Sequence, residues 1–223
     1  MDMNEKEVKK YAENEVKSTI VEEPAATYGY CNDTKRYSYA DYLTWLDDKR
    51  REIINGIVRL MFSAPTTNHA LISGKIVFEL GSYIKKQKGK CKVFSAPFDV
   101  RLPQNDEVAN DKIYTVVQPD ICVICDLSKL DKRGCLGAPD LIVEIQSPST
   151  AKYDLTEKFS VYESSGVREY WIVFPDSSAI TIFHLQENGK YDGGTVYEFE
   201  GIIQSNVLQG LGMDIKELFE DLY

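Results

Sequence analysis

The chain is built around the sequence Pro139-Asp140-Leu141-Ile142-Val143-Glu144-Ile145-Gln146-Ser147-Pro148. Its middle part, residues 141–146, is short, rich in branched apolar residues and flanked by prolines, which predicts a buried strand. Because side chains alternate along a strand, Glu144 and Gln146 share one face of it. A carboxylate inside an apolar strand is costly to bury unless it is paired or binds a metal ion.

A second apolar run, residues 121–125, directly follows Asp120 and predicts a neighbouring strand. Two strands that each bring a carboxylate to one place can hold a hard divalent cation such as magnesium. Lys158 lies further along the chain, in a segment with helical character, where its ammonium group can stabilise negative charge in a transition state. A buried salt bridge between Glu144 and Lys158, without catalysis, is the alternative that the spacing leaves open.

These residues also carry a family resemblance. Four motifs, Pro119-Asp120, residues 140–150, Glu157-Lys158 and residues 166–171, resemble the Uma2 family (DUF820), a group of endonucleases in the PD-(D/E)xK nuclease superfamily. The resemblance extends from about Tyr37 to the C-terminus. It implies a restriction-endonuclease-like fold and an enzyme that hydrolyses phosphodiester bonds of nucleic acid, with DNA as the expected substrate.

The resemblance also implies roles for individual residues. Asp120 and Glu144 are the expected metal-binding acids, with Mg²⁺ or Mn²⁺ as the cofactor. Gln146 stands where the superfamily usually has a lysine, which is a departure from the motif; it is expected to orient water or a ligand. Lys158 matches a version of the motif in which the lysine has migrated to the following helix. The alternative is a catalytically inactive module that binds nucleic acid or protein on the same fold.

Three further residues are secondary candidates. The resemblance implies acids close to the site at Glu52, in a predicted hairpin, and at Asp99, in a short strand. Each has a plain alternative as a surface charge on a strand. His69 lies near the start of a predicted helix, where it is either a structural histidine or a group that positions phosphate or water.

The net charge of −9 argues against a simple DNA-binding surface, because nucleic-acid binders usually carry a basic footprint. Carboxylates of a metal site would account for part of this charge, and a bound divalent ion would partly offset it. A local basic patch at either of two groups of cationic residues stays an alternative, and each group can equally be a solvated face or loop. The two groups are Lys85, Lys86, Lys88, Lys90 and Lys92, and Lys129, Lys132 and Arg133.

Composition and leader signals predict a soluble cytoplasmic protein that does not associate with membranes. No run approaches the roughly 18 apolar residues of a membrane span, and the charged residues 1–17 lack an apolar signal core. The chain has five cysteines, and in a cytoplasmic protein we expect them to be reduced. Cys122 and Cys125 form a C-x-x-C pair within an apolar strand, which favours core packing over a zinc or redox site.

We expect residues 1–36 to form a charged arm or helix, with disorder as an equal alternative, and residues 37–223 to form the Uma2-like domain. A nuclease that cuts both strands of a duplex often needs two active sites. The chain is therefore a candidate for a two-fold homodimer, with the charged segment as an exchange arm.

The alternation of strands and helices predicts an α/β or α+β fold, in which helices flank a mixed central sheet with hairpins at both ends. Asn55-Gly56 predicts a type I′ turn between residues 51–54 and 57–61. Other short strands are expected over residues 92–96, 97–102, 170–174, 179–185 and 197–199. Helices are expected over residues 39–48 after a Ser38 cap, from Thr66 or Thr67 to about Lys88, over residues 154–165, and after Asp214 to Leu222.

Overall fold

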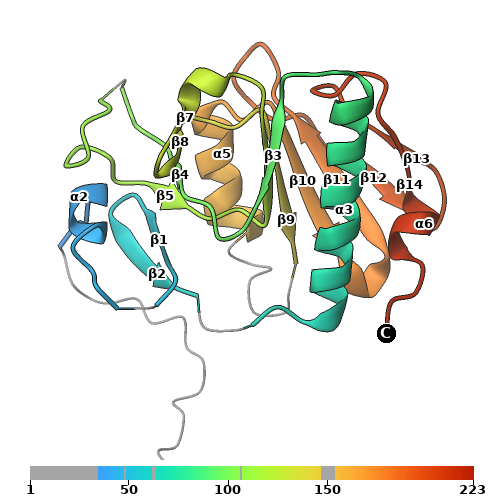
Figure 1. The fold of residues 1–223 in the computed structure, drawn as a ribbon, viewed down its shortest axis with the longest axis horizontal. Coiled ribbons are helices and arrows are strands. Elements are labelled where there is room, and N and C mark those ends of the chain that lie inside the picture. The colour runs from blue at the N-terminus through green and yellow to red at the C-terminus, as the bar shows by residue number, and fades with distance from the viewer. Residues whose placement is uncertain (1–34, 48, 62–63, 106, 147–153) are drawn as a thin grey trace, which may run out of the picture. The chain divides into compact units, whose positions relative to one another are not determined.

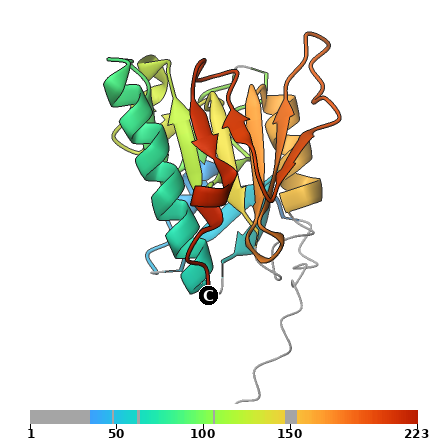
Figure 2. The same ribbon diagram turned by 90° about the vertical axis from the view of Figure 1, so that its right-hand side faces the viewer.

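A computed structural model describes the chain at residues 35–47, 49–61, 64–105, 107–146 and 154–223. Figures 1 and 2 show its ribbon from two sides. The predicted N-terminal arm lies outside the described residues except for its last two positions, and so does the Ser147-to-Thr150 part of the motif.

The main sheet has six strands in the order β12-β11-β10-β9-β6-β3. The strand β9 is parallel to β10, and every other neighbouring pair is antiparallel, so the predicted mixed sheet is confirmed. The bounds of these strands are β3 (Lys92–Ser95), β6 (Ile121–Ile124), β9 (Leu141–Ile145), β10 (Glu169–Phe174), β11 (Ala179–His184) and β12 (Thr195–Glu198).

A second six-stranded sheet, in the order β2-β1-β5-β4-β8-β7, is present in addition to the predicted mixed sheet. The strand expected over residues 97–102 is shorter in the structure, where only β4 forms. Pro97 has no N–H to donate to a neighbouring strand. The strand β4 pairs with β5 and β8 of this second sheet and not with the main sheet. The strands are β1 (Arg51–Ile54), β2 (Ile57–Leu60), β4 (Val100–Arg101), β5 (Val116–Val117), β7 (Leu130–Asp131) and β8 (Gly134–Leu136).

The hairpin between β1 and β2 forms as predicted. Asn55 and Gly56 have φ values of 51° and 83°, the positive angles that a type I′ turn requires. The resulting register places Glu52 opposite Arg59. A further two-stranded sheet pairs β13 (Ile202–Gln204) with β14 (Gly212–Asp214) near the C-terminus.

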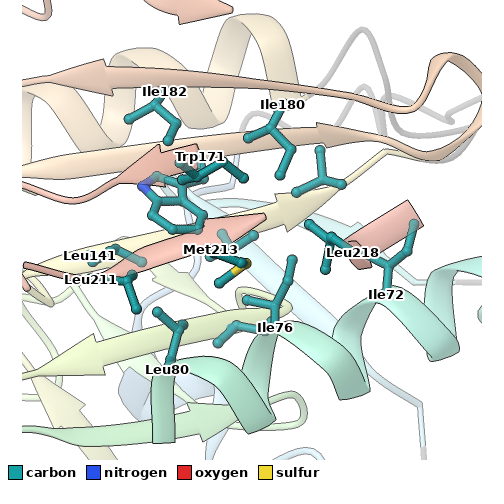
Figure 3. Packing of buried hydrophobic residues seen from close by; sticks show 14 of the residues in the cluster. Ile72, Ile76, Leu80, Leu141, Trp171, Ile180, Ile182, Leu211, Met213 and Leu218 are labelled. Atoms are coloured by element: carbon teal, nitrogen blue, oxygen red, sulfur yellow. The ribbon is translucent and has the colours of Figure 1, made fainter. Parts of the chain in front are cut away.

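The long helix α3 (Thr67–Lys86) covers one face of the main sheet, as Figure 1 shows, and confirms the predicted helix. Thr66 caps its start by accepting a hydrogen bond from the His69 N–H at 3.2 Å. In Figure 3, apolar side chains of α3 point toward Leu141 and Trp171 of the sheet.

The helical segment expected over residues 154–165 covers the opposite face. It begins as a π-helical turn, η3 (Asp154–Lys158), and continues as α5 (Phe159–Ser165). Tyr162 packs there in a second apolar cluster with Ile142 and Ile172. Gly166, at φ 85°, ends α5 as predicted.

Two short helices, α2 (Tyr39–Tyr42) and α6 (Ile215–Phe219), stop earlier than predicted. In α2 the capping box between Ser38 and Asp41 forms. Beyond Tyr42 the chain leaves the helix, and Trp45 packs against the ring of Tyr42 at 5.6 Å.

The cysteines differ from the prediction of reduced thiols, because Cys91 and Cys125 form a disulfide. Antiparallel pairing of β3 with β6 places Lys92 opposite Ile124, so the next residues outward on the two strands face each other. Of the C-x-x-C pair for which core packing was predicted, Cys122 is free and buried, whereas Cys125 is in the disulfide. Cys135 is also free and buried.

Glu169 is a buried carboxylate with a structural role. It is 0% exposed, and it accepts hydrogen bonds from Trp171 Nε1 at 2.6 Å, Ser205 Oγ at 3.1 Å, and the backbone N–H groups of Asn206 and Val207, each at 2.9 Å. We predict that Glu169→Gln lowers the free energy of unfolding by about 2–3 kcal/mol, because both carboxylate oxygens accept hydrogen bonds and the amide replaces one of them with an NH₂ group, which cannot accept.

Urea denaturation measures this change. Glu198→Gln is the matched control, because Glu198 is exposed on edge strand β12 and its loss is expected to cost less than about 0.5 kcal/mol. Equal stability of the two variants would contradict the structural role of Glu169.

Candidate active site

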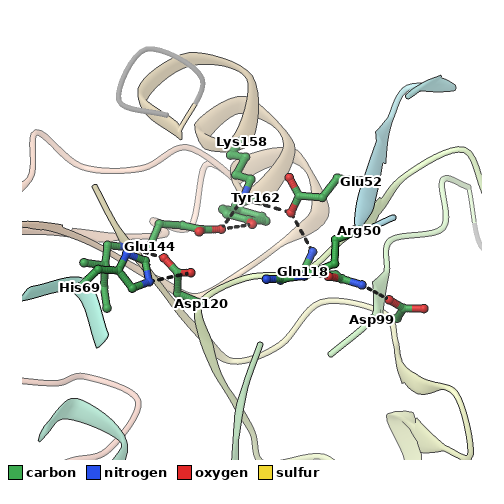
Figure 4. Close-up of polar contacts among 10 residues, drawn as sticks. Arg50, Glu52, His69, Asp99, Gln118, Asp120, Glu144, Lys158 and Tyr162 are labelled. Atoms are coloured by element: carbon green, nitrogen blue, oxygen red, sulfur yellow. Dashed lines mark hydrogen bonds and ion pairs between the residues drawn. The ribbon is translucent and has the colours of Figure 1, made fainter. Parts of the chain in front are cut away.

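A buried lysine lies between two buried acids where β1, β9 and η3 meet. Lys158 Nζ is 2.9 Å from Glu144 Oε1 and 3.1 Å from Glu52 Oε1. The three side chains are only 4%, 4% and 2% exposed, respectively. The salt bridge that the sequence left open between Glu144 and Lys158 therefore forms, and Glu52 joins it as a second acid (Figure 4).

Tyr162, a buried residue of α5, is part of the same group. Its hydroxyl donates a hydrogen bond to Glu144 Oε1 at 2.6 Å. Burial, followed by the Glu144 carboxylate, raises the pKa of Tyr162 well above its ordinary value. The hydroxyl therefore stays protonated and, together with Lys158, fixes this oxygen of Glu144.

Asp120 lies at the edge of this group, just before β6. The register of β6 and β9 sets Ile121 opposite Val143, and Asp120 Oδ2 accepts a hydrogen bond from the Ile145 N–H at 2.8 Å. Its other oxygen, Oδ1, is 3.3 Å from His69 Nε2, and these two side chains are 19% and 17% exposed. Figure 4 shows the Asp120 and Glu144 carboxylates next to each other, with His69 on the outer side.

Gln118 links Glu52 to Asp99. Its backbone N–H donates to Glu52 Oε1 at 2.8 Å, and its side-chain Nε2 donates to Asp99 Oδ1 at 2.9 Å. Asp99 also accepts from the Tyr42 hydroxyl at 3.4 Å, and burial, followed by the Asp99 charge, raises the pKa of Tyr42 to about 12. Asp99 thus joins the site through Gln118 and not through the Lys158 ion pairs.

A second ion pair holds η3, the turn that carries Lys158. Arg59 Nη2 of β2 lies 2.7 and 2.8 Å from the two oxygens of Glu157. Glu157 precedes Lys158 directly, so this pair fixes the backbone from which the lysine reaches the acids. No local pattern predicts this ion pair, because the two partners are 98 positions apart.

Gln146 follows β9 and is 8% exposed. Its backbone N–H donates to the Val173 carbonyl at 2.8 Å, which extends the pairing of β9 with β10. Alternation along the strand puts its side chain on the Glu144 face.

A second Pro-Asp pair repeats the arrangement of Asp120 at the other end of β6 and β9. Asp140 Oδ2 accepts a hydrogen bond from the Cys125 N–H at 2.6 Å, and its Oδ1 lies 2.6 Å from Arg168 Nη2. Both aspartates thus tie one strand to the other, but only Asp120 lies beside Glu144 and Lys158.

The donor set fits a hard divalent cation. Magnesium is typically held by one or two carboxylates, with water and substrate phosphates as its other ligands, and Asp120 and Glu144 supply two carboxylates from adjacent strands. Within the described ranges, no group of three or more His, Cys, Asp or Glu side chains is gathered as a ready metal cage. Summed over Glu52, Asp120, Glu144 and Lys158, three negative charges and one positive charge leave −2, which a divalent ion balances.

Comparisons with known proteins identify the family and the fold. The model of the Uma2 family, described as "Putative restriction endonuclease", matches residues 39–216. A curated relative from Synechocystis sp., "Uncharacterized protein slr1290", is 26% identical over 159 residues, which cover 70% of this chain and 78% of the relative.

A solved structure from Anabaena variabilis, described as "a putative nuclease belonging to DUF820", superposes with a TM-score of 0.63 at 19% identity. The match covers 82% of this chain and 97% of that one, which confirms the nuclease-like fold. Among the described helices, none is long and apolar enough to cross a membrane. The family match spans most of the sequence, and the chain belongs to the Uma2 family.

Proposed function

We propose that the chain is a divalent-metal-dependent endonuclease that hydrolyses phosphodiester bonds of DNA. The observation that carries this proposal is the position of Asp120 beside the buried group of Glu52, Glu144 and Lys158, in a chain of a nuclease family. A bound Mg²⁺ or Mn²⁺ ion would supply activation of water and stabilisation of charge on the scissile phosphate.

The residues of the chain take separate roles in this proposal. Asp120 and Glu144 hold the cation, and Tyr162 keeps Glu144 in place by its hydrogen bond. Lys158 neutralises the charge that develops on the phosphate, from the position between the two acids. Gln146, on the Glu144 face, orients the attacking water or a metal ligand.

A cleavage assay tests the proposal directly. The purified chain is incubated with supercoiled DNA, linear duplex, single-stranded DNA and RNA, each with Mg²⁺, with Mn²⁺ or with EDTA. We expect cation-dependent cleavage of duplex DNA, together with a rise in melting temperature when the cation binds the folded state. A folded chain that cleaves none of these substrates with either cation would refute the endonuclease.

A catalytically inactive module that binds nucleic acid or protein is the second candidate. Glu144 Oε1 is already engaged by Lys158 and Tyr162, and a glutamine stands at position 146, where the superfamily usually has lysine. The same experiment separates the two candidates, because the module binds its partner without cation-dependent cleavage.

The proposal includes the setting of the enzyme. We place it in the cytoplasm, with DNA as its partner, and propose that it acts on duplex DNA as a two-fold homodimer, so that each strand meets one active site. Light scattering with and without duplex DNA measures this assembly.

A further inference from the structure

The cationic side chains closest to the acids form ion pairs within the protein. Lys158 is paired with Glu52 and Glu144, and Arg59 is paired with both oxygens of Glu157. These groups hold the site together, but a nucleic-acid backbone that reaches Asp120 needs a cation that faces solvent.

The lysine-rich group of residues 85–92 predicted from the sequence lies at the wrong end for this task. His69 is in the first turn of α3, whereas Lys85 and Lys86 are in its last, and a helix of 20 residues is about 30 Å long. Lys92 pairs with Ile124 at the far end of β6, while Asp120 precedes the near end.

Arg50 lies at the near end and faces solvent. It directly precedes β1, and its Nε donates a hydrogen bond to the Gln118 side-chain oxygen at 3.1 Å. Gln118 is neutral, so this contact orients the guanidinium group without cancelling its charge. Figure 4 shows Arg50 beside Gln118, on the side of Glu52 and Asp99, with Asp120 and His69 across from it.

Three other arginines differ from Arg50 because each is paired with a carboxylate. Arg51 is paired with Asp47, Arg101 with Asp131 at 2.7 Å, and Arg168 with Asp140 at 2.6 Å. Within the described part of the chain, no carboxylate lies within ion-pair distance of Arg50, which is exposed.

We propose that Arg50 binds a backbone phosphate of the substrate beside the cleavage site. This inference rests on the proposed function and adds the residue that engages the nucleic acid there. The planar guanidinium group offers paired N–H donors that match two phosphate oxygens, and Gln118 holds its inner Nε while the two terminal nitrogens remain for the ligand.

Binding of a short fluorescein-labelled DNA duplex, measured by anisotropy in Ca²⁺ over a range of salt concentrations, tests the inference. We expect Arg50→Gln to raise the Kd about 10-fold. The slope of log K against the logarithm of the salt concentration should fall in magnitude by about 1, because one phosphate contact is lost. In the cleavage assay with Mg²⁺, KM should rise while kcat changes little, since ground-state binding is what is lost.

Arg168→Gln is the matched control, because it also removes an exposed arginine but one paired with Asp140 at the other end of β9. Its Kd and salt slope are expected to stay close to wild type. Equal effects of the two substitutions, no effect of Arg50→Gln, or a wild type that does not bind the duplex would each overturn the inference.

These failures are distinct from failure of the proposed function. A chain whose duplex binding depends on Arg50 but which cleaves nothing would refute the endonuclease and support only the binding of a backbone phosphate by Arg50. A chain that cleaves DNA equally well with Arg50→Gln, at unchanged KM, would support the endonuclease and overturn the role of Arg50.

Discussion

Asp120→Asn is expected to reduce cleavage of DNA by roughly 1000-fold or more, which corresponds to about 4 kcal/mol of lost transition-state stabilisation. The substitution removes one of two carboxylates proposed to hold the cation, and a neutral amide oxygen is a much weaker ligand for a hard ion. The rise in melting temperature with Mg²⁺ or Mn²⁺ should also disappear, which gives a readout that does not depend on activity.

The fold should survive this change. The Asn side chain has nearly the same shape, and its amide oxygen can still accept the hydrogen bond that Asp120 Oδ2 accepts from the Ile145 N–H. Because the Asp120 side chain is 19% exposed, we expect the free energy of unfolding without metal to fall by no more than about 1 kcal/mol.

Asp140→Asn is a closely matched control. Asp140 also follows a proline, accepts a backbone N–H across the same pair of strands, and lies beside a cationic side chain, Arg168. It is at the opposite end of β6 and β9 from Glu144 and Lys158, so its substitution is expected to leave metal binding and cleavage unchanged. Equal loss of cleavage in both variants would show that the effect comes from strand pairing, and would contradict a metal-binding role for Asp120.

The contrast between these aspartates shows what the sequence could predict. Apolar runs next to prolines located both strands, and these runs set Asp120 just before one strand and Glu144 within the other, while the family resemblance implied their role as metal-binding acids. Lys158 could be placed near them because a single helical segment follows β9. The strand positions depend on local patterns and on adjacent strands, and the roles of the three residues depend on the family resemblance.

Other members of the site depend on contacts between distant parts of the chain. Glu52 meets Lys158 because the hairpin belongs to a second sheet, and the sequence predicted only one. No sequence pattern singled out Gln118 as a site residue, because its role depends on hydrogen bonds to Glu52 and Asp99, which are distant in the sequence. The Cys91–Cys125 disulfide likewise requires the register of β3 against β6, which composition and compartment cannot supply.

The second large effect is expected at Lys158, for which stability and catalysis must be measured separately. Lys158→Met keeps most of the apolar stem but removes the ammonium group that contacts Glu144 and Glu52. Both acids would then be buried without their cation, so we predict a loss of about 3–5 kcal/mol in the free energy of unfolding. This is a large part of the roughly 5–15 kcal/mol that stabilises a typical domain.

Lys190→Met provides the control for the loss of a lysine from an ion pair. Lys190 Nζ lies 2.8 Å from Glu163 Oε2, but its side chain is 70% exposed, so its loss is expected to cost less than about 1 kcal/mol. Urea denaturation of both variants at neutral pH measures the difference. Similar stabilities would contradict the buried ion pair as a structural element.

Cleavage is then compared at a temperature where circular dichroism shows Lys158→Met to be folded. If Lys158 also neutralises charge in the transition state, cleavage should fall about 100-fold or more. Metal affinity should change less, because an ammonium group is not a ligand. The double variant Glu52→Gln, Lys158→Met separates the two roles: removing one of the stranded acids should recover part of the stability, while the catalytic loss remains since the cation is still absent. A stable, fully active Lys158→Met protein would contradict both roles of this lysine.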